Sequence, residues 1–181
     1  MIKINLDTDS AVLREQKAGT TLLLSGTIYS ARDAAHKRIQ NLLEQGKDLP
    51  IILKDKVIYY MGPTPTKPGK AIGSCGPTSS YRMDGFLEMT LQNGVAATIG
   101  KGTRDANVAR LAKEYKAPYL LAVGGAGAYL AQCVTSSKIL AFEDLGAEAV
   151  RELIIKDFPV IVGIDKNGER SANMWTARNA A

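Results

Sequence analysis

The amino-acid sequence predicts a single α/β domain spanning residues 1–181. Short apolar runs, rich in β-branched and aromatic residues, alternate with segments of helical periodicity, and glycine or proline borders most of the runs. A length of 181 residues is typical of one domain with a sizeable core. Hydrophobic residues make up 45% of the chain and charged residues 23%, and no apolar run reaches the roughly 18 residues that a membrane span requires. We therefore expect a globular protein without a membrane-spanning segment.

Strands are expected where apolar runs contain β-branched or aromatic residues and end at glycine or proline. The eight expected strands are residues 21–24, 51–53, 57–60, 95–99, 119–123, 139–142, 153–155 and 160–164. A long internal loop is expected between residues 61 and 76, where Pro63, Pro65 and Pro68 are interspersed with glycines.

Helices are expected where apolar residues recur on one helical face and end signals flank the segment. The first has an expected capping box at Ser30 and Asp33 and ends at Gly46. The third has Thr103 as its expected N-cap and stops before Pro118. The four expected helices cover residues 31–45, 79–94, 104–117 and 126–134.

The chain contains one histidine and two cysteines, Cys75 and Cys133. An iron–sulfur cluster or a structural zinc ion needs about four ligands drawn from such residues. The chain is therefore expected to hold neither group, and no metal ligand is assigned to it. Because the cysteines lie far apart in sequence and no signal peptide is recognised, we expect reduced thiols in a cytoplasmic protein.

The formal net charge is +5, from 23 lysines and arginines against 18 acidic residues, and the basic residues are scattered. No basic run is interleaved with aromatic residues, so nucleic-acid binding is not expected. A small anionic substrate or an acidic partner surface suits this mild positive excess.

Three basic residues, Arg32, Arg82 and Lys101, stand at the expected amino-terminal ends of helices. A cation there is unfavourable by a few tenths to about 1 kcal/mol unless an anion offsets it. If the three converge, they form a site for an anion with more than one carboxylate or phosphate. Alternatively they form weak surface pairs. These pairs would be Arg32 with Asp33, Arg82 with Asp84, and Lys101 with Asp105.

The segment of residues 73–84 is rich in small and hydroxyl side chains that can approach a ligand closely. Thr78 and Arg82 are four residues apart and share one helix face if the helix extends that far. In the alternative interpretation, Thr78 or Ser79 is simply the N-cap of the helix.

Cys75 and His36 are two further candidates for chemistry. Cys75 lies beside Gly76, and a nucleophilic role would require His36, the only histidine, as its base. His36 stands one helical turn after Arg32. It is a proton carrier, a hydrogen-bond donor to substrate, or a buried residue with a structural hydrogen bond.

Together, these segments resemble the β subunit, or C-terminal domain, of class I fumarases and of the related tartrate dehydratases, which are iron–sulfur hydro-lyases. The resemblance extends from Gly19 to Gly168 in the order of the family. The forms Ala-Arg-Asp-Ala-Ala-His and Tyr-Tyr-Met-Gly-Pro are more similar to fumarase, whereas Ser79 replaces the second threonine of the family's usual Gly-Pro-Thr-Thr. The matching stretches are residues 25–38, 59–63, 76–84, 99–102, 122–126 and 138–146.

The resemblance implies a swivelling β/β/α-type domain, with a mixed sheet flanked by helices. It implies that a [4Fe–4S] cluster is held by three cysteines of a partner α subunit, with one iron free to bind the substrate as a Lewis acid. It also implies that Arg32, Arg82 and Lys101 bind a dicarboxylate and that Thr78 is the base that exchanges the C3 proton of malate. A threonine hydroxyl is a weak base, so a carboxylate of the partner is expected to activate it.

The function that this resemblance favours is the β subunit of a two-subunit class I fumarase, which hydrates fumarate reversibly to (S)-malate and is inactive alone. The family suggests an α2β2 heterotetramer. Two other hypotheses stay open, namely the β subunit of a tartrate dehydratase and a stand-alone dicarboxylate-binding protein.

Overall fold

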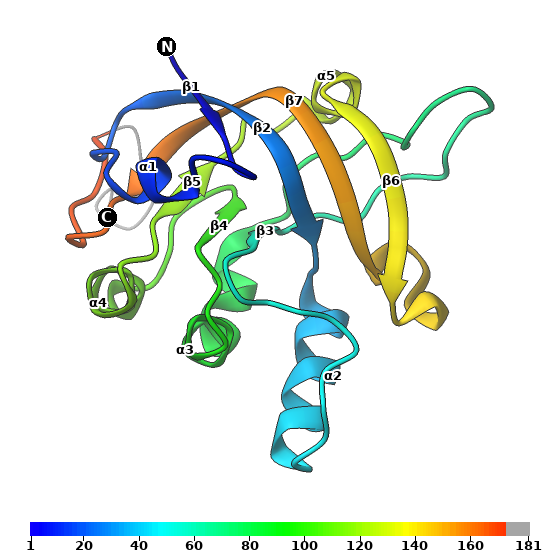
Figure 1. Cartoon of the computed structure of the whole chain (residues 1–181), viewed down its shortest axis with the longest axis horizontal. Helices are drawn as coiled ribbons and strands as arrows, with labels where there is room; N and C mark the ends of the chain where they lie inside the picture. Colours follow the sequence, from blue (N-terminus) through cyan, green and yellow to red (C-terminus); the bar gives the residue numbers. More distant parts are fainter. Residues whose placement is uncertain (173–181) are drawn as a thin grey trace, which may run out of the picture.

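The computed structural model describes residues 1–172 and confirms the expected α/β class, with a mixed sheet and flanking helices (Figure 1). Seven strands form one sheet in the order β1-β2-β3-β4-β5-β7-β6. The strands are β1 (Ile2–Asn5), β2 (Thr21–Ser30), β3 (Val57–Tyr59), β4 (Ala97–Gly100), β5 (Tyr119–Leu121), β6 (Val134–Ala141) and β7 (Val150–Ile164).

Five of these strands close into a barrel. Strands β2, β3, β4 and β5 are parallel to one another, and β7 closes the ring between β5 and β2, antiparallel to both. Strands β1 and β6 lie outside the closed ring, paired with β2 and β7. Because the four parallel strands share one direction, their carboxyl ends meet at the same end of the barrel.

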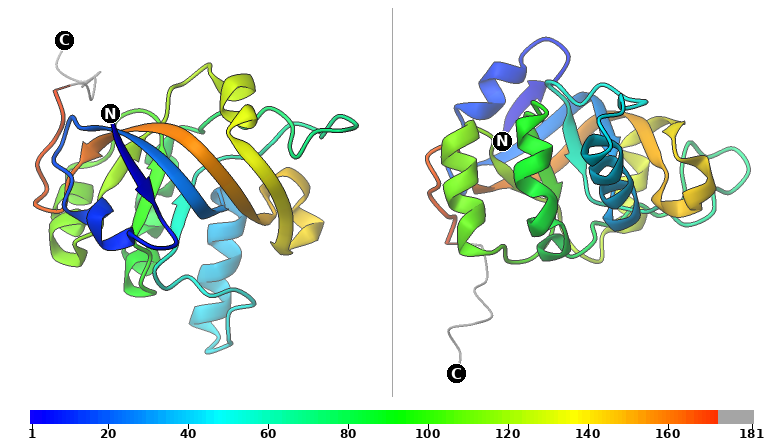
Figure 2. Two further views of the ribbon diagram at one scale, coloured as in Figure 1. Left: turned by 45° about the horizontal axis from the view of Figure 1, so that its top comes forward. Right: turned by 90° about the horizontal axis from the view of Figure 1, so that it is seen from below.

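The helices cover one outer side of this barrel. Figure 2 shows α2, α3 and α4 side by side beneath the sheet, and the short α1 and α5 lie at other positions around it. The α-helices are α1 (Ser10–Arg14), α2 (Asp33–Glu44), α3 (Asp84–Gln92), α4 (Ala106–Tyr115) and α5 (Gly127–Gln132), and the 3-10 helices are η1 (Ser80–Met83) and η2 (Glu143–Glu148). Within residues 1–172, no helix is long and apolar enough to cross a membrane.

Alternation along the barrel strands separates two apolar clusters. Tyr59, Ile99 and Phe158 belong to a cluster inside the barrel, whereas the next residues along, such as Ile58, belong to a cluster that includes the apolar faces of α2, α3 and α4. Strands β3 and β4 are buried along their whole length because both of their faces are covered.

Several expected strands are confirmed with different limits, and one is wrong. Strand β2 continues to Ser30, β6 starts earlier than expected, and the two strands expected at 153–155 and 160–164 are parts of β7. Pro159 fits within β7 because it lies between the residues that pair with β6 and those that pair with β5, where one strand edge has no neighbour. Residues 51–53 are not a strand: Ile51 and Leu53 are buried and Ile52 is exposed, as in a strand, but the segment pairs with no other strand. Strand β1 and helix α1 were not expected.

The expected helices are confirmed, but two of their expected caps are wrong. Helix α2 begins after Arg32, with no side-chain cap, so Ser30 and Asp33 form no capping box. The cap of α4 is Asp105, whose carboxylate accepts a hydrogen bond from the Asn107 backbone N–H at 2.8 Å, and not Thr103. The helix expected over 79–94 starts as the 3-10 helix η1 and continues as α3.

Candidate functional site

The carboxyl end of the barrel carries the residues of interest. Arg32 follows β2, Gly62 follows β3, Lys101 directly follows β4, and Gly124 follows β5. Ligand sites of parallel α/β sheets lie at this end, where the loops after neighbouring strands meet.

Thr78 and Arg82 are in direct contact. The Thr78 backbone N–H donates to the Tyr60 carbonyl at 2.8 Å, and an Arg82 Nη2–H donates to Thr78 Oγ1 at 3.0 Å. The expected pair of Arg82 with Asp84 is therefore wrong. Ser79 holds the N-cap position of η1, as the capping interpretation expects, but its side chain makes no cap hydrogen bond. A guanidinium beside a hydroxyl oxygen favours the alkoxide form and leaves the hydroxyl proton free to be removed.

Lys101 is joined to the same segment through the backbone. The Ser80 N–H donates to the Lys101 carbonyl at 3.0 Å, and the Lys101 N–H donates to Ser80 Oγ at 3.0 Å. The Lys101 side chain runs beside Gly124, where a Cβ atom would lie 3.5 Å from Lys101 Cδ. Its ammonium forms no ion pair within residues 1–172, so the expected pair with Asp105 is wrong and the charge is available to an anion.

Arg32 lies on a neighbouring part of this edge and is held by two carboxylates. Its Nε–H donates to Asp33 at 3.3 Å, as the surface-pair alternative expects, and its Nη2 lies 3.6 Å from Glu148. The side chain crosses Gly62, where a Cβ atom would be 3.2 Å from Arg32 Cδ. Among the described residues, Arg32 forms no hydrogen bond or ion pair with Thr78, Arg82 or Lys101; Arg32 packs on Gly62, and Thr78 bonds the Tyr60 carbonyl two residues earlier.

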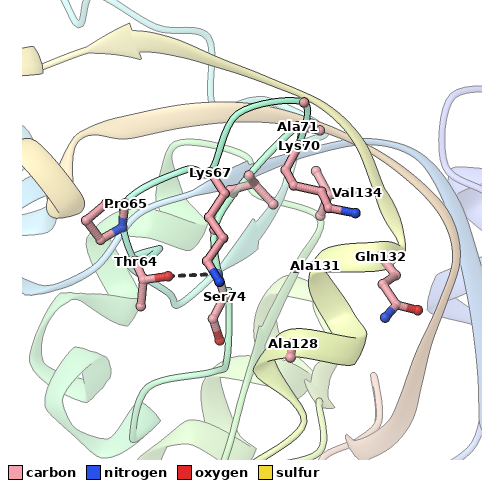
Figure 3. A pocket seen from close by; sticks show the side chains of 13 residues that line it. Thr64, Pro65, Lys67, Lys70, Ala71, Ser74, Ala128, Ala131, Gln132 and Val134 are labelled. Carbon is pink, nitrogen blue, oxygen red and sulfur yellow. Dashed lines mark hydrogen bonds between the residues drawn. The ribbon is translucent and has the colours of Figure 1, made fainter.

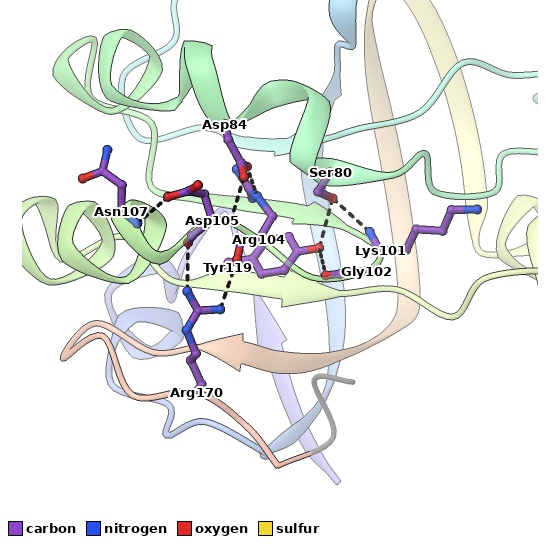
Figure 4. A network of polar contacts seen from close by, with 9 residues as sticks. All are labelled: Ser80, Asp84, Lys101, Gly102, Arg104, Asp105, Asn107, Tyr119 and Arg170. Carbon is purple, nitrogen blue, oxygen red and sulfur yellow. Dashed lines mark hydrogen bonds and ion pairs between the residues drawn. The ribbon is translucent and has the colours of Figure 1, made fainter. Parts of the chain in front are cut away.

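A buried polar network fixes this edge from behind (Figure 4). The fully buried Arg104 side chain pairs with Asp84, whose other oxygen accepts the Asp105 backbone N–H at 2.8 Å. The Arg104 guanidinium stacks over the Tyr119 ring at 4.6 Å, and the Tyr119 hydroxyl donates to Ser80 Oγ at 3.0 Å. Burial raises the pKa of Tyr119 above its ordinary value, which keeps this hydroxyl protonated as a donor.

This network was missed by sequence reasoning because its members come from four separate segments. Asp84 was expected to pair with Arg82, and no spacing rule relates it to Arg104. A charged residue that follows a strand end closely, as Arg104 follows β4, is the one signal that points to it.

His36 is a structural residue in this arrangement. Its Nδ1 bonds the Arg32 carbonyl at 2.8 Å, so Nδ1 carries the proton, and its ring packs edge-on against Tyr60 at 5.6 Å between centroids. The side chain is 1% exposed, and burial lowers its pKa, assisted by Arg104. Of the three interpretations of His36, the buried residue with a structural hydrogen bond is the one confirmed.

Among the described residues, Cys75 is not in contact with His36, whose ring packs against Tyr60 and Phe86. The thiol is buried, and burial raises the pKa of Cys75 to about 12, which suppresses the thiolate. Both cysteines are free, as expected. Within residues 1–172 there is no group of three or more His, Cys, Asp or Glu side chains arranged to hold a metal ion.

The fold and this edge define an α/β barrel domain with cations and one threonine at the carboxyl ends of its parallel strands. The chain belongs to the Fumarase C-terminus family, whose family model matches residues 1–175. The resemblance seen in the sequence is therefore confirmed.

Curated relatives of the family are hydro-lyases by name. The chain is similar to "Fumarate hydratase 2" of Leishmania major, with 36% identity over 169 residues, 92% of this chain and 30% of that protein. It is also similar to "Fumarate hydratase class I, aerobic" of Escherichia coli (strain K12), with 36% identity over 160 residues, 87% of this chain and 29% of that protein. The chain thus spans less than a third of these relatives.

A third relative has a length close to that of this chain. The "Putative L(+)-tartrate dehydratase subunit beta" of Methanocaldococcus jannaschii is 35% identical over 162 residues, which cover 86% of this chain and 83% of that protein. In this relative, the matched region makes up most of a polypeptide that is named as a subunit.

Proposed function

We propose that this chain is the β subunit of a two-subunit class I fumarase, which hydrates fumarate reversibly to (S)-malate. The observation that carries the proposal is the hydrogen bond of 3.0 Å from Arg82 to Thr78, in a segment that Ser80 joins to the backbone of Lys101, whose ammonium forms no ion pair within residues 1–172. An edge of the barrel that carries cations and a hydroxyl group suits a dicarboxylate from which one proton is removed. Family membership supplies the class of reaction.

The cations have a distinct role in the proposed reaction. In the dehydration direction, Thr78 Oγ takes the C3 proton of malate and the electron pair of the C–H bond moves toward the adjacent carboxylate. The substrate carries one more negative charge after this step. Arg82 and Lys101, together with Arg32, stabilise that charge directly, and preorganised charges of this kind are often the largest contribution to catalysis.

Thr78 needs help to act as the base. Arg82 favours the alkoxide of Thr78, but the hydroxyl proton must still be accepted by another group. No carboxylate of residues 1–172 is hydrogen-bonded to Thr78. We therefore assign activation of Thr78 to a carboxylate of the partner.

The proposed [4Fe–4S] cluster does not fit the donor set of this chain. The two cysteines are buried in an apolar cluster, and within residues 1–172 no third His, Cys, Asp or Glu joins either of them in a group that could hold a metal. The proposal places the cluster on a partner α subunit, consistent with an α2β2 assembly in the cytoplasm, and gives this chain the binding and positioning of substrate.

A tartrate dehydratase β subunit is the second candidate. The Methanocaldococcus relative favours it, because the present chain matches 83% of a polypeptide named as such a subunit. A stand-alone dicarboxylate-binding protein is the third candidate. It would bind malate tightly without any partner, whereas the proposed subunit binds it weakly alone.

The test is an anaerobic assay of the chain alone and of the chain reconstituted with its cluster-bearing partner, with malate, fumarate and tartrate as substrates. We expect turnover of malate and fumarate in the mixture only. Turnover of tartrate in place of malate would support the second candidate, and activity of the isolated chain would overturn the subunit proposal. Thr78→Val should abolish exchange of the malate C3 proton with solvent deuterium, and Thr78→Ser should restore part of it.

A further inference from the structure

Residues 63–74 form a projecting loop next to the candidate site, which we name the arm (Figure 1). Its two sides meet at the base, where the Thr64 N–H donates to the Ser74 carbonyl at 3.0 Å and the Ser74 N–H donates to Thr64 Oγ1 at 2.9 Å. Gly73 allows this close approach, since a Cβ atom there would lie 2.0 Å from the Thr64 carbonyl oxygen. Residues 64–71 beyond the base are all exposed. The conformation of the base is therefore held by hydrogen bonds within the chain, whereas the tip makes few contacts with the rest of the protein.

A groove of about 570 Å³ separates the arm from helix α5 and the start of β6 (Figure 3). Lys67, Lys70 and Ser74 line its arm side, and Ala128, Ala131 and Val134 line the opposite side. Neither lysine forms an ion pair within residues 1–172. The groove thus combines an apolar wall with two uncompensated positive charges.

The arm and the groove are continuous with the candidate site. The chain runs from Ser74 through Cys75 and Gly76 to Thr78, and the Cys75 N–H donates to the Gly127 carbonyl of α5 at 3.1 Å. A Cβ atom at Gly76 would lie 3.4 Å from the Gly127 Cα, so the arm's return path packs directly on α5. Ser74, which lines the groove, therefore stands only four positions before Thr78 in the chain.

Large apolar side chains border the same region. Tyr81, which neighbours Arg82, is 64% exposed, Val123, which neighbours the glycine beside Lys101, is 57% exposed, and Tyr129 on α5 is 56% exposed. Exposed aromatic residues near a groove are typical of the core of a protein interface. These three side chains, Tyr81, Val123 and Tyr129, are named the apolar edge.

We propose that the arm, the groove and this apolar edge are the docking surface for the cluster-bearing partner, which lays an acidic segment between the arm and α5. This inference rests on the proposed function. The proposed occupant is suggested by the relatives: in the Leishmania protein the matched part is 30% of the polypeptide, and the remaining 70% is joined to it. An acidic segment is specified by Lys67 and Lys70, since complementary charge steers association and fixes register. Three prolines restrict the free arm, which lowers the entropy lost on binding.

The experiment compares binding of the partner to the wild-type chain and to three variants. The partner is the source organism's polypeptide that corresponds to the unmatched part of the fumarate hydratases. The first variant replaces residues 65–71 by three glycines and keeps the base and the buried Ile72. The second is Lys67→Glu with Lys70→Glu, and its matched control is Lys47→Glu with Lys113→Glu, two exposed lysines remote from the groove.

We expect the arm replacement to weaken binding at least about 100-fold, a loss typical of removing several interface anchors. The charge reversal should weaken binding about 10-fold at low salt and less at high salt, because exposed charges are screened. The control pair should bind like the wild type. Circular dichroism and thermal unfolding of each isolated chain establish that the variants are folded.

A photo-crosslinking residue gives a second, independent readout. Placed as Lys67→p-benzoylphenylalanine it should crosslink to the partner, and placed as Lys113→p-benzoylphenylalanine it should not. Wild-type affinity of folded arm variants in an active complex would overturn this inference and leave the proposed function intact. Failure of the wild-type chain to bind the partner or to yield activity would overturn both.

Discussion

The buried network behind the site and the arm in front of it occupy the same end of the barrel but are held in different ways. Arg104 has a side chain with 0% exposure and is surrounded by Asp84, Tyr119 and Tyr60. The tip of the arm is exposed throughout and has a single internal backbone bond, from the Lys70 N–H to the Lys67 carbonyl at 3.1 Å.

The difference shows which part of the site this chain can build alone. The network joins η1, α3 and the loop after β4, so the relative placement of Arg82, Thr78 and Lys101 is determined within the chain. The arm has no such network beyond its base, and its tip is exposed. The placement of these three residues is thus intrinsic to the chain, whereas the arm is the part for which we propose a partner.

The largest expected effect is loss of stability when the network is broken. Asp84→Ala leaves the Arg104 guanidinium buried without its partner, which costs about 3–5 kcal/mol for a buried ion pair. Urea unfolding at pH 7 measures the loss. The exposed pair of Arg38 with Asp144, at 2.8 Å, is the matched control, and Asp144→Ala should cost less than about 1 kcal/mol. Equal losses in the two variants would remove the distinction between the network and the surface.

The next effect concerns activity without loss of stability. Arg82→Ala and Lys101→Ala remove charges that have no structural ion pair within residues 1–172. Each should reduce kcat of the assembled enzyme by about 100- to 1000-fold, as loss of one preorganised donor does. The free energy of unfolding should change by less than about 0.5 kcal/mol. Near-normal rates would return both residues to a surface role.

A smaller effect is expected from His36 as the pH falls. Burial lowers its pKa below the ordinary value of 6.5, so below pH 6.5 the unfolded chain binds a proton that the folded chain does not. Stability contributed by neutral His36 is present above pH 6.5 and is lost as the pH falls, with a slope approaching about 1.4 kcal/mol per pH unit. Unfolding curves between pH 5 and 8 measure this slope. His36→Gln should reduce it, and an unchanged slope would show that His36 is not responsible.

The smallest effect is expected at the tip of the arm. Replacing residues 65–71 by three glycines should change the free energy of unfolding of the isolated chain by less than about 0.5 kcal/mol, since exposed residues away from structural contacts contribute little. Ile72→Ala, which truncates a side chain that is 4% exposed, should cost about 2–5 kcal/mol. Thermal or urea unfolding of the two variants measures these two changes in the free energy of unfolding. A large loss from the tip replacement would show that the arm supports the fold of the free chain.

Sequence reasoning found the elements and the residues whose roles depend on local pattern. Alternating apolar runs located most strands, and helical spacing located α2, α3 and α4, because both periods are written along contiguous residues. The motif around Thr78 also identified the segment that contacts Arg82. The extra length of β2 and the union of two runs into β7 were not predictable, since they depend on pairing between distant strands.

The same limit applies to the site. The pairs expected for Arg82 and Lys101 were near in sequence, but Asp84 pairs with Arg104 from the loop after β4, and no local spacing indicates this. The groove beside the arm was not predictable either, because its two walls are separated by more than fifty residues of chain.

Anaerobic hydration of fumarate is the most direct test of the division between this chain and its partner. The rate is measured for the isolated chain, for the cluster-bearing polypeptide alone, and for their mixture. The isolated chain and the mixture are each measured with the wild-type, Arg82→Ala and Lys101→Ala forms of the chain. We expect activity in the wild-type mixture alone, reduced at least about 100-fold by either substitution. Activity of the isolated chain, or equal rates in the wild-type and substituted mixtures, would contradict this assignment.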